Sequence, residues 1–378
     1  MTAKLTFHPL GNADCTRIDL ADSRKILLDY ADMRNCDDQW DNRIDLPTEL
    51  KADLRAAKRD YYDTVCFTHL DNDHCCGSDD FFWWDHARKY QGEGRIKIKT
   101  LWVPAGAVLE EGCEDAARVI RQEARHRLRE GYGIRVFSRP GHLKEWLEKQ
   151  GLTLESRAHL IVDAGKLVPD YNIDGPESVE FFVHSPFAWR INENEVIDRN
   201  NDSIVFQATF KENGQLTRAL FMSDIDYDAI DLIVKTSKKH NNEHRLEWDI
   251  FKVPHHSSYT AIGPEKGKDE TKPTEEVKWL CETQGQERHI MMSTSWSIPL
   301  KGTKEDDDVQ PPHRQAANYY KRVAEAKDGQ YKVTMDLPNK AKPKPSVIKI
   351  TAYGAEFVVI ATSTAGAATV VSTPARAG

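Results

Sequence analysis

The sequence has no long apolar run, no excess of basic charge and no regular cysteine spacing. Its 378 residues include 52 Lys plus Arg against 60 Asp plus Glu, so the net charge of −8 excludes an overall attraction to phosphates. With 30% charged and 9% aromatic residues, the chain is too charged for a multi-span membrane protein and too rich in packing side chains for disorder. The seven cysteines are odd in number and the start lacks a secretory apolar segment, so we expect a cytoplasmic protein.

One stretch near the end, residues 357–375, carries no charge and is nearly long enough to span a bilayer. It contains repeated Thr and Ser and one Pro, which are costly in hydrocarbon without compensating Leu or Phe. A tail anchor is the alternative. We expect instead no membrane contact, with a final strand at 356–361 and a flexible tail that together make up residues 356–378.

Short β-branched runs alternate with helix-like stretches and predict a mixed α/β chain. We expect strands at 16–20, 26–29, 64–68, 96–103, 179–184, 203–210, 219–222, 250–253, 290–293 and 347–351. We expect helices at 50–59, 115–130, 143–149, 228–238, 274–283 and 314–326. The linker-like stretches are too short to divide two cores, so residues 1–355 are predicted to form one domain with inserted loops at about 263–273 and 302–312.

The string Cys66-Phe-Thr-His-Leu-Asp-Asn-Asp-His-Cys-Cys-Gly77 carries the densest polar cluster of the sequence. His69, Asp71, Asp73 and His74 fall within six residues, directly after a predicted buried strand. Such groups repel one another or lose solvation unless a cation sits among them, which indicates a divalent metal site. A polar loop that only meets water is the alternative.

Three further stretches place similar side chains at predicted strand ends. One hydrophobic strand ends at Asp224, another ends at His255 and His256, and His313 follows two prolines at the start of a helix. Because the carboxyl ends of strands in an α/β fold converge on one rim, these groups are expected to meet the His69 to His74 cluster.

This ordered set of motifs resembles the metallo-β-lactamase fold superfamily. The "KVPHHSS" string, the late Pro-His and the opening "HPLGNADCTRIDL…ILLDYAD", a hairpin that ends in Asp29, resemble its ComEC-type branch, named for the hydrolase domain of the DNA-uptake channel. "NNDSIVFQATF" is similar to that branch's central strand, and the likeness covers most of residues 4–355. The resemblance implies a four-layer αββα sandwich.

The resemblance also implies two divalent cations and a hydrolytic reaction through a metal-bridging hydroxide. His69 and Asp71 would hold one cation, Asp73 and His74 the other, Asp224 would bridge them, and His255 would complete the second site. His256 would support the metal ligands without itself binding a cation, and Asp73 would also orient the attacking water. Three carboxylates among six ligands make Mn²⁺ and Mg²⁺ rivals of Zn²⁺.

For several other side chains the sequence allows two interpretations. His184 is the candidate for a missing third ligand of the first cation, with a packed or solvated strand histidine as the alternative. Cys75 and Cys76, where relatives carry Gly-Gly, are either thiolate ligands or small buried side chains. Ser223 replaces a usual Gly before Asp224. His313 is either a donor to the substrate or a surface histidine.

The substrate class implied by the resemblance is a phosphodiester, in particular nucleic acid. The arginines that recur at helical spacing, Arg118, Arg121, Arg125 and Arg129, the lysines Lys340, Lys342, Lys344 and Lys349, and the aromatic run Phe81 to Trp84 could contact such a substrate. Solvated faces and core packing are the alternatives. Amide or ester hydrolysis, and a partner-binding role within a complex or a homo-oligomer, are the competing functions.

Overall fold

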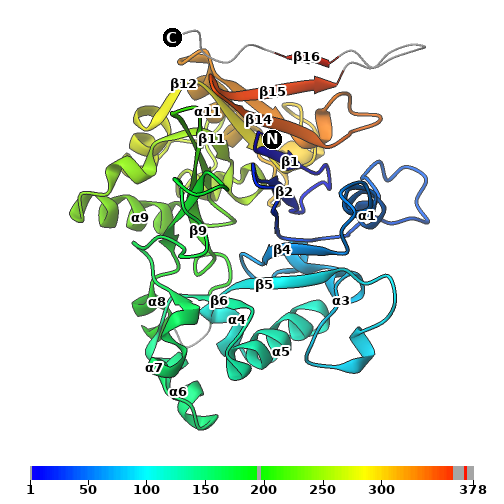
Figure 1. The fold of residues 1–378 in the computed structure, drawn as a ribbon. Helices are drawn as coiled ribbons and strands as arrows, with labels where there is room; N and C mark the ends of the chain where they lie inside the picture. Colours follow the sequence, from blue (N-terminus) through cyan, green and yellow to red (C-terminus); the bar gives the residue numbers. More distant parts are fainter. Residues whose placement is uncertain (1, 194–196, 361–369, 373–378) are drawn as a thin grey trace.

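The computed structural model describes residues 2–193, 197–360 and 370–372, and its strands form two sheets (Figure 1). The larger sheet has ten strands, in the order β16 (Val370–Ser372), β15 (Gly354–Ile360), β14 (Ser346–Thr351), β1 (Lys4–Phe7), β2 (Thr16–Asp19), β3 (Lys25–Leu28), β4 (Tyr61–Cys66), β5 (Lys97–Pro104), β6 (Ile134–Phe137) and β7 (Ile161–Val162). Strands β3 to β7 are parallel, and the others pair antiparallel.

The second sheet has six strands, in the order β13 (Gln330–Val333), β12 (Gly285–Ser293), β11 (Trp248–Lys252), β10 (Gln215–Phe221), β9 (Val205–Glu212) and β8 (Val179–Ser185). Strands β10 to β13 are parallel, whereas β8, β9 and β10 are antiparallel. Both sheets therefore contain a parallel half whose strands end at one edge.

The α-helices are α1 (Leu46–Ala56), α2 (Asn72–Cys75), α3 (Ser78–Phe81), α4 (Ala105–Leu109), α5 (Asp115–Glu130), α6 (Gly141–Lys149), α7 (Leu154–Arg157), α8 (Ala188–Glu193), α9 (Tyr227–Lys239), α10 (Glu275–Lys278) and α11 (Arg314–Glu325). The single turns are η1 (Arg88–Tyr90), η2 (Ala158–Leu160), η3 (Glu243–Leu246), η4 (Pro254–Ser257), η5 (Tyr259–Ala261), η6 (Trp279–Thr283, a π turn), η7 (Lys304–Asp307) and η8 (Thr334–Asp336).

Three apolar cores separate four layers. The central core lies between the sheets and joins Leu5 and Trp102 of one to Phe206 and Ile250 of the other. A second core packs α1 and α5 on the outer face of the ten-stranded sheet, and a third packs α9 and α11 on the six-stranded sheet (Figure 1). Successive strand side chains point to opposite faces, which is why Ile250 enters the central core and Phe251 the third core. The predicted αββα sandwich is confirmed.

Most predicted elements are present. Helix α5 has the predicted bounds, and each predicted strand overlaps an observed one. Strands β1, β6, β7 and β13 were not predicted, because runs of two to four residues carry too little periodicity. The predicted tail contains β16, paired with β15, while residues 361–369 and 373–378 lie outside the described residues.

In the described part of the chain, no helix combines the length and the apolar character needed to cross a membrane. The two predicted inserts contact each other. Lys266 Nζ of the first donates to the carbonyl oxygens of Asp306 and Asp308 of the second, at 2.6 and 3.0 Å.

Candidate metal centre

Side chains from the ends of several strands converge at one edge of the two sheets. His69, Asp73 and His74 follow β4, Asp224 follows β10, and His256 follows β11. Their ligand atoms form two groups, one of His69, Asp73 and His74 and one of Asp14, His74, Asp224 and His256, each within 4.8 Å. We call these six residues the histidine–aspartate cluster.

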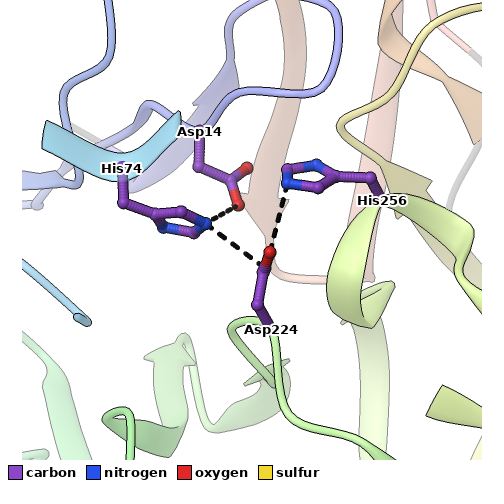
Figure 2. A group of neighbouring side chains, drawn as sticks. All are labelled: Asp14, His74, Asp224 and His256. Atoms are coloured by element: carbon purple, nitrogen blue, oxygen red, sulfur yellow. Dashed lines mark ion pairs between the residues drawn. The ribbon is translucent and has the colours of Figure 1, made fainter. Parts of the chain in front are cut away.

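His74 belongs to both groups of the cluster, and its two ring nitrogens face different partners. Its Nδ1 is 3.0 Å from Asp29 Oδ2, and its Nε2 faces Asp224 Oδ1 at 3.3 Å and Asp14 Oδ2 at 3.5 Å (Figure 2). Asp29 is itself held by the Thr68 backbone N–H, which donates to Oδ1 at 2.7 Å. A carboxylate behind Nδ1 sets the ring orientation and leaves Nε2 as the ligand atom.

His256 is arranged in the same way on the opposite side of Asp224. Its Nδ1 donates to the Thr294 carbonyl oxygen at 2.6 Å, and its Nε2 lies 3.2 Å from Asp224 Oδ2 and 3.3 Å from Asp73 Oδ2 (Figure 2). The two oxygens of Asp224 therefore face two different imidazoles. A carboxylate so placed can bind a cation together with either ring.

His69 and Asp71 lie beside this pair. The His69 ring centroid is 3.9 Å from that of His74, and its Nδ1 contacts the hydroxyls of Thr68 and Ser223 at 3.2 and 3.4 Å. Asp71 Oδ2 is 3.7 Å from His69 Nε2, while Asp71 Oδ1 accepts from Arg199 at 2.9 Å. One oxygen of Asp71 is thus neutralised by an arginine and the other faces the cluster.

The backbone around the cluster is unusual, because non-glycine residues occupy the left-handed region. The φ angles are 57° at Asp29, 51° at Ser223, and 45°, 50° and 65° at His255, His256 and Ser257. Each such residue costs about 1–3 kcal/mol, and such residues concentrate at functional sites. The turn at Ser223 demands a positive φ, which a glycine would adopt without this cost.

The electrostatics of the cluster show how much negative charge is buried in it. Burial alone would lower the pKa of His74 and His256, but the surrounding carboxylates together outweigh it. Asp224 and Asp29 raise the pKa of His74 well above its ordinary value, and Asp224 and Asp73 raise that of His256 to about 10. Burial would raise the pKa of Asp224, but the imidazoles of His256 and His74 hold it well below its usual range. Burial and the neighbouring His74 charge lower the pKa of His69 to about 3.

The donor set fits divalent cations. Among the described residues, His69 Nε2, His74 Nε2, Asp14 Oδ1 and Asp224 Oδ1 are buried without a hydrogen-bond partner. Leaving such atoms unpaired is costly, whereas cations held by the two groups would satisfy them. Imidazole nitrogens together with carboxylate oxygens suit Zn²⁺ and Mn²⁺.

The neighbouring His255 was predicted as a ligand, with His256 behind it. The structure places His256 in the cluster, whereas His255 is half-buried, belongs to neither group, and has its ring centroid 6.2 Å from that of His256. Both histidines sit in the left-handed turn η4, so the chain direction at this turn decides which ring turns inward.

Two other candidates lie elsewhere. His184 Nε2 donates to the Arg245 carbonyl oxygen at 2.9 Å and is a buried strand histidine outside the cluster. The Cys75 thiol is buried against the Leu70 carbonyl, and burial raises its pKa, so it stays protonated; Cys76 is half-buried and belongs to neither group. The two cysteines therefore match the small-side-chain alternative.

His313 is buried beside the turn that carries the paired histidines. The ring Nδ1 of His313 accepts from the Tyr259 backbone N–H at 3.2 Å, and the backbone N–H of His313 donates to the Ser257 carbonyl oxygen at 3.0 Å. Burial and the charge of Lys266 lower its pKa to about 4, so the ring is neutral at pH 7. With Nδ1 an acceptor, the proton resides on Nε2, which has no partner among the described residues.

Sequence reasoning missed Asp14 and its partner. Asp14 lies between β1 and β2, and its Oδ2 pairs at 2.5 Å with Lys252 Nζ in β11, both side chains being buried. The available signal was Lys252, a charged residue inside the hydrophobic string Ile250 to Val253. A lysine buried in a strand requires a counter-charge.

The fold and the centre together define a four-layer αββα protein with a buried carboxylate and imidazole centre suited to divalent cations. No family model and no curated protein sequence matches the chain.

Solved structures with similar folds include a diphosphatase from the PhnP family, with 9% identity, a TM-score of 0.32, and 77% of this chain and 85% of that chain covered. The metallo-β-lactamase SMB-1 bound to 2-mercaptoethanesulfonate has 12% identity and a TM-score of 0.30, with 67% and 81% covered. Unliganded yeast PDE1 has 10% identity and a TM-score of 0.41, with 88% and 97% covered. At these values the assignment of the centre rests on its own geometry, and the ComEC-type branch stays a prediction.

Proposed function

We propose that this chain is a metal-dependent hydrolase that cleaves phosphodiesters, with nucleic acid as the substrate class. The observation that carries the proposal is the convergence of His74 and His256 on the two oxygens of the buried Asp224. Two divalent cations held there would lower the pKa of a bound water and polarise the bond under attack.

The geometry suggests how the residues would divide between the cations. His69, Asp73 and His74 would hold one, and Asp14 and His256 the other, with Asp224 between them and Asp71 in reach of His69. Asp73 would also orient the attacking water, because its carboxylate is partly exposed and its Oδ2 lies 3.3 Å from His256 Nε2. Carboxylate-rich sites favour cations that prefer oxygen ligands, and such cations also bind phosphate oxygens, which supports a phosphodiester over an amide.

His313 would act on the substrate as a neutral hydrogen-bond donor. Its Nδ1 is occupied by the Tyr259 N–H, and its Nε2–H is unpartnered. A donor aimed at a developing negative charge stabilises the transition state more than the ground state.

The experiment combines metal analysis with hydrolysis of bis(p-nitrophenyl) phosphate, single-stranded DNA, duplex DNA and RNA under Mn²⁺, Mg²⁺ and Zn²⁺. We expect cation-dependent cleavage, loss of both metal and rate in Asp224→Asn, and retention of both in Asp228→Asn, an exposed carboxylate on α9. His313→Ala should keep its metal and lose about 10²–10⁴ in rate.

Two results would contradict the proposal. Full activity of Asp224→Asn with metal bound would remove the shared carboxylate from the mechanism. Cleavage of ester or amide substrates, with none of the four phosphodiesters cleaved under any cation, would assign the centre to a different bond.

A further inference from the structure

A pocket of about 450 Å³ lies on the outer side of the ten-stranded sheet, remote in the fold from the histidine–aspartate cluster. It is lined by the end of α1, by the link from α1 to β4, and by parts of the segment that runs from α3 to the start of β5. Asp60 immediately precedes β4, whereas His69 follows the end of that strand. The pocket and the cluster therefore lie at opposite ends of β4.

The charge of the lining is strongly positive. Five cationic side chains face two acidic ones, although the whole chain has a net charge of −8. Arg59 is paired with Asp63, and Lys97 with Asp60. Lys51 and Arg55 form no ion pair within the described part of the chain. Lys51 Nζ lies 5.5 Å from the centroid of the Phe81 ring, a contact that leaves its charge uncompensated, so both cations remain available to an anion.

Arg95 shapes one wall of the pocket rather than serving as a free charge. Its guanidinium donates to the carbonyl oxygens of Asp79 and Phe82, the latter at 2.9 Å, and pairs with Asp80 at 3.2 Å. These bonds tie the loop that carries Gly92 and Gly94 to the aromatic run. The wall is thus fixed before any ligand binds, which lowers the entropic cost of binding.

The aromatic run Phe81 to Trp84 divides between the core and this pocket. Phe81, Phe82 and Trp84 are buried in the core between sheet and helices, as the packing alternative predicted, but Trp83 is half-buried and lines the pocket. Its Nε1–H is used by Asp85 Oδ1 at 3.1 Å. What the indole offers to the pocket is therefore apolar ring surface, on which a planar ring can stack.

We propose that this pocket binds a nucleotide as a second site, with the phosphate held by Lys51 and Arg55 and the base stacked on Trp83. Two unpaired cations suit a phosphate group, and an indole at the same rim suits a base, so the two halves together select a ligand that carries both. Because the site lies at the opposite end of β4 from the cluster, its ligand is not the one under hydrolysis. The ligand chemistry is either a free nucleotide or a nucleotide within a strand.

Calorimetric titration of the full chain with adenosine monophosphate, adenosine, inorganic phosphate and a short DNA oligonucleotide tests the proposal. Adenosine monophosphate contains no phosphodiester, so the proposed hydrolysis does not consume it. We expect it to bind at low salt more tightly than adenosine or phosphate, and Arg55→Ala and Trp83→Leu each to weaken it by about tenfold.

The matched control is Lys149→Ala, since Lys149 is also an exposed cation in the last turn of a helix, α6, that packs on the same face of the sheet as α1. It should bind as the unchanged protein does. Weaker binding of the oligonucleotide in Arg55→Ala, with no binding of the mononucleotide, would assign the pocket to a strand. Equal affinities in Arg55→Ala and the unchanged protein would overturn the proposal, as would equal affinities for phosphate and the mononucleotide. Arg55 is exposed, so its loss leaves folding intact even if Trp83→Leu does not.

Discussion

Single residues shape the centre through backbone strain and through the groups behind the ligands. At His255 and His256 the chain turns in the left-handed region, which points the His256 ring inward against the Thr294 carbonyl. Behind His74, the carboxylate of Asp29 has the matching function, and Asp29 itself has a positive φ. The orientation of each ligand thus depends on a neighbour that does not itself join the cluster.

Asp29→Asn tests that dependence. The asparagine has the size of the aspartate, and its oxygen can still accept from the Thr68 N–H. Its NH₂ group then takes the place of Oδ2 and cannot accept a hydrogen bond from His74 Nδ1. We expect metal affinity to fall by about 10–100-fold while the fold survives. Competition with a chelator of known affinity measures it, with Asp228→Asn as control. An unchanged metal affinity would mean that Asp29 only holds the Thr68 backbone and does not orient His74.

At the scale of elements, α5 shows how a charged helix can serve the fold. Arg121 and Arg125 both pair with Glu111, and they donate to the carbonyl oxygens of Glu110 and Val108. These two arginines of the predicted nucleic-acid face therefore fasten the loop that precedes the helix. Arg118 and Arg129 remain exposed.

The buried ion pair between Glu123 and Arg127 on α5 makes the stability of the fold depend on pH. Burial opposes ionisation of Glu123, but hydrogen bonding from His86 and the charge of Arg127 lower its pKa to about 2, from an ordinary 4.5. Because the folded-state pKa is the lower one, the ionised carboxylate stabilises the fold fully above pH 4.5, and this contribution is lost as the pH falls toward 2.

Glu123→Gln should therefore lower the free energy of unfolding at neutral pH and flatten its dependence in that acidic range. We expect a loss of about 3 kcal/mol, at the low end for a broken buried pair, since Asp85 still contacts Arg127 at 3.1 Å. Denaturant unfolding from pH 7 to pH 3 measures it. Glu130→Gln, exposed on the same helix, should change stability little, and equal losses in the two variants would refute the argument.

At the scale of the whole molecule, the centre joins the two sheets. Asp29, His69 and His74 follow strands of the ten-stranded sheet, Asp224 and His256 follow strands of the other, and the buried Asp14 to Lys252 pair links them again. A cation bound there would connect both halves of the sandwich. Metal binding is therefore expected to stabilise the entire fold.

Chelation should lower the melting temperature by several degrees, because cations that bind only the folded state add to its stability and screen Asp14, Asp73 and Asp224 from one another. Scanning calorimetry with and without a chelator, followed by readdition of Mn²⁺ or Zn²⁺, measures the shift and its reversal. Asp224→Asn should show a much smaller shift. An unchanged melting curve for the unchanged protein would count against a metal site.

The sequence by itself determined which residue types end the strands and how the layers alternate. The strings that end at His69 to His74, at Asp224 and at His255 and His256 predicted a shared edge, because parallel strands in such folds end together. The apolar periodicity of α5, α9 and α11 predicted helices that cover sheets.

Only the tertiary structure decided which side chains meet. Asp14 joins the cluster from a loop distant in sequence, His184 turns to Arg245, and Arg127 turns inward to Glu123. The choice between His255 and His256 depends on a turn of three consecutive positive φ angles. Residue spacing reports which residues lie near one another along an element, but the direction of a side chain after a strained turn, and its partners across the sheets, follow from packing between segments far apart in the chain.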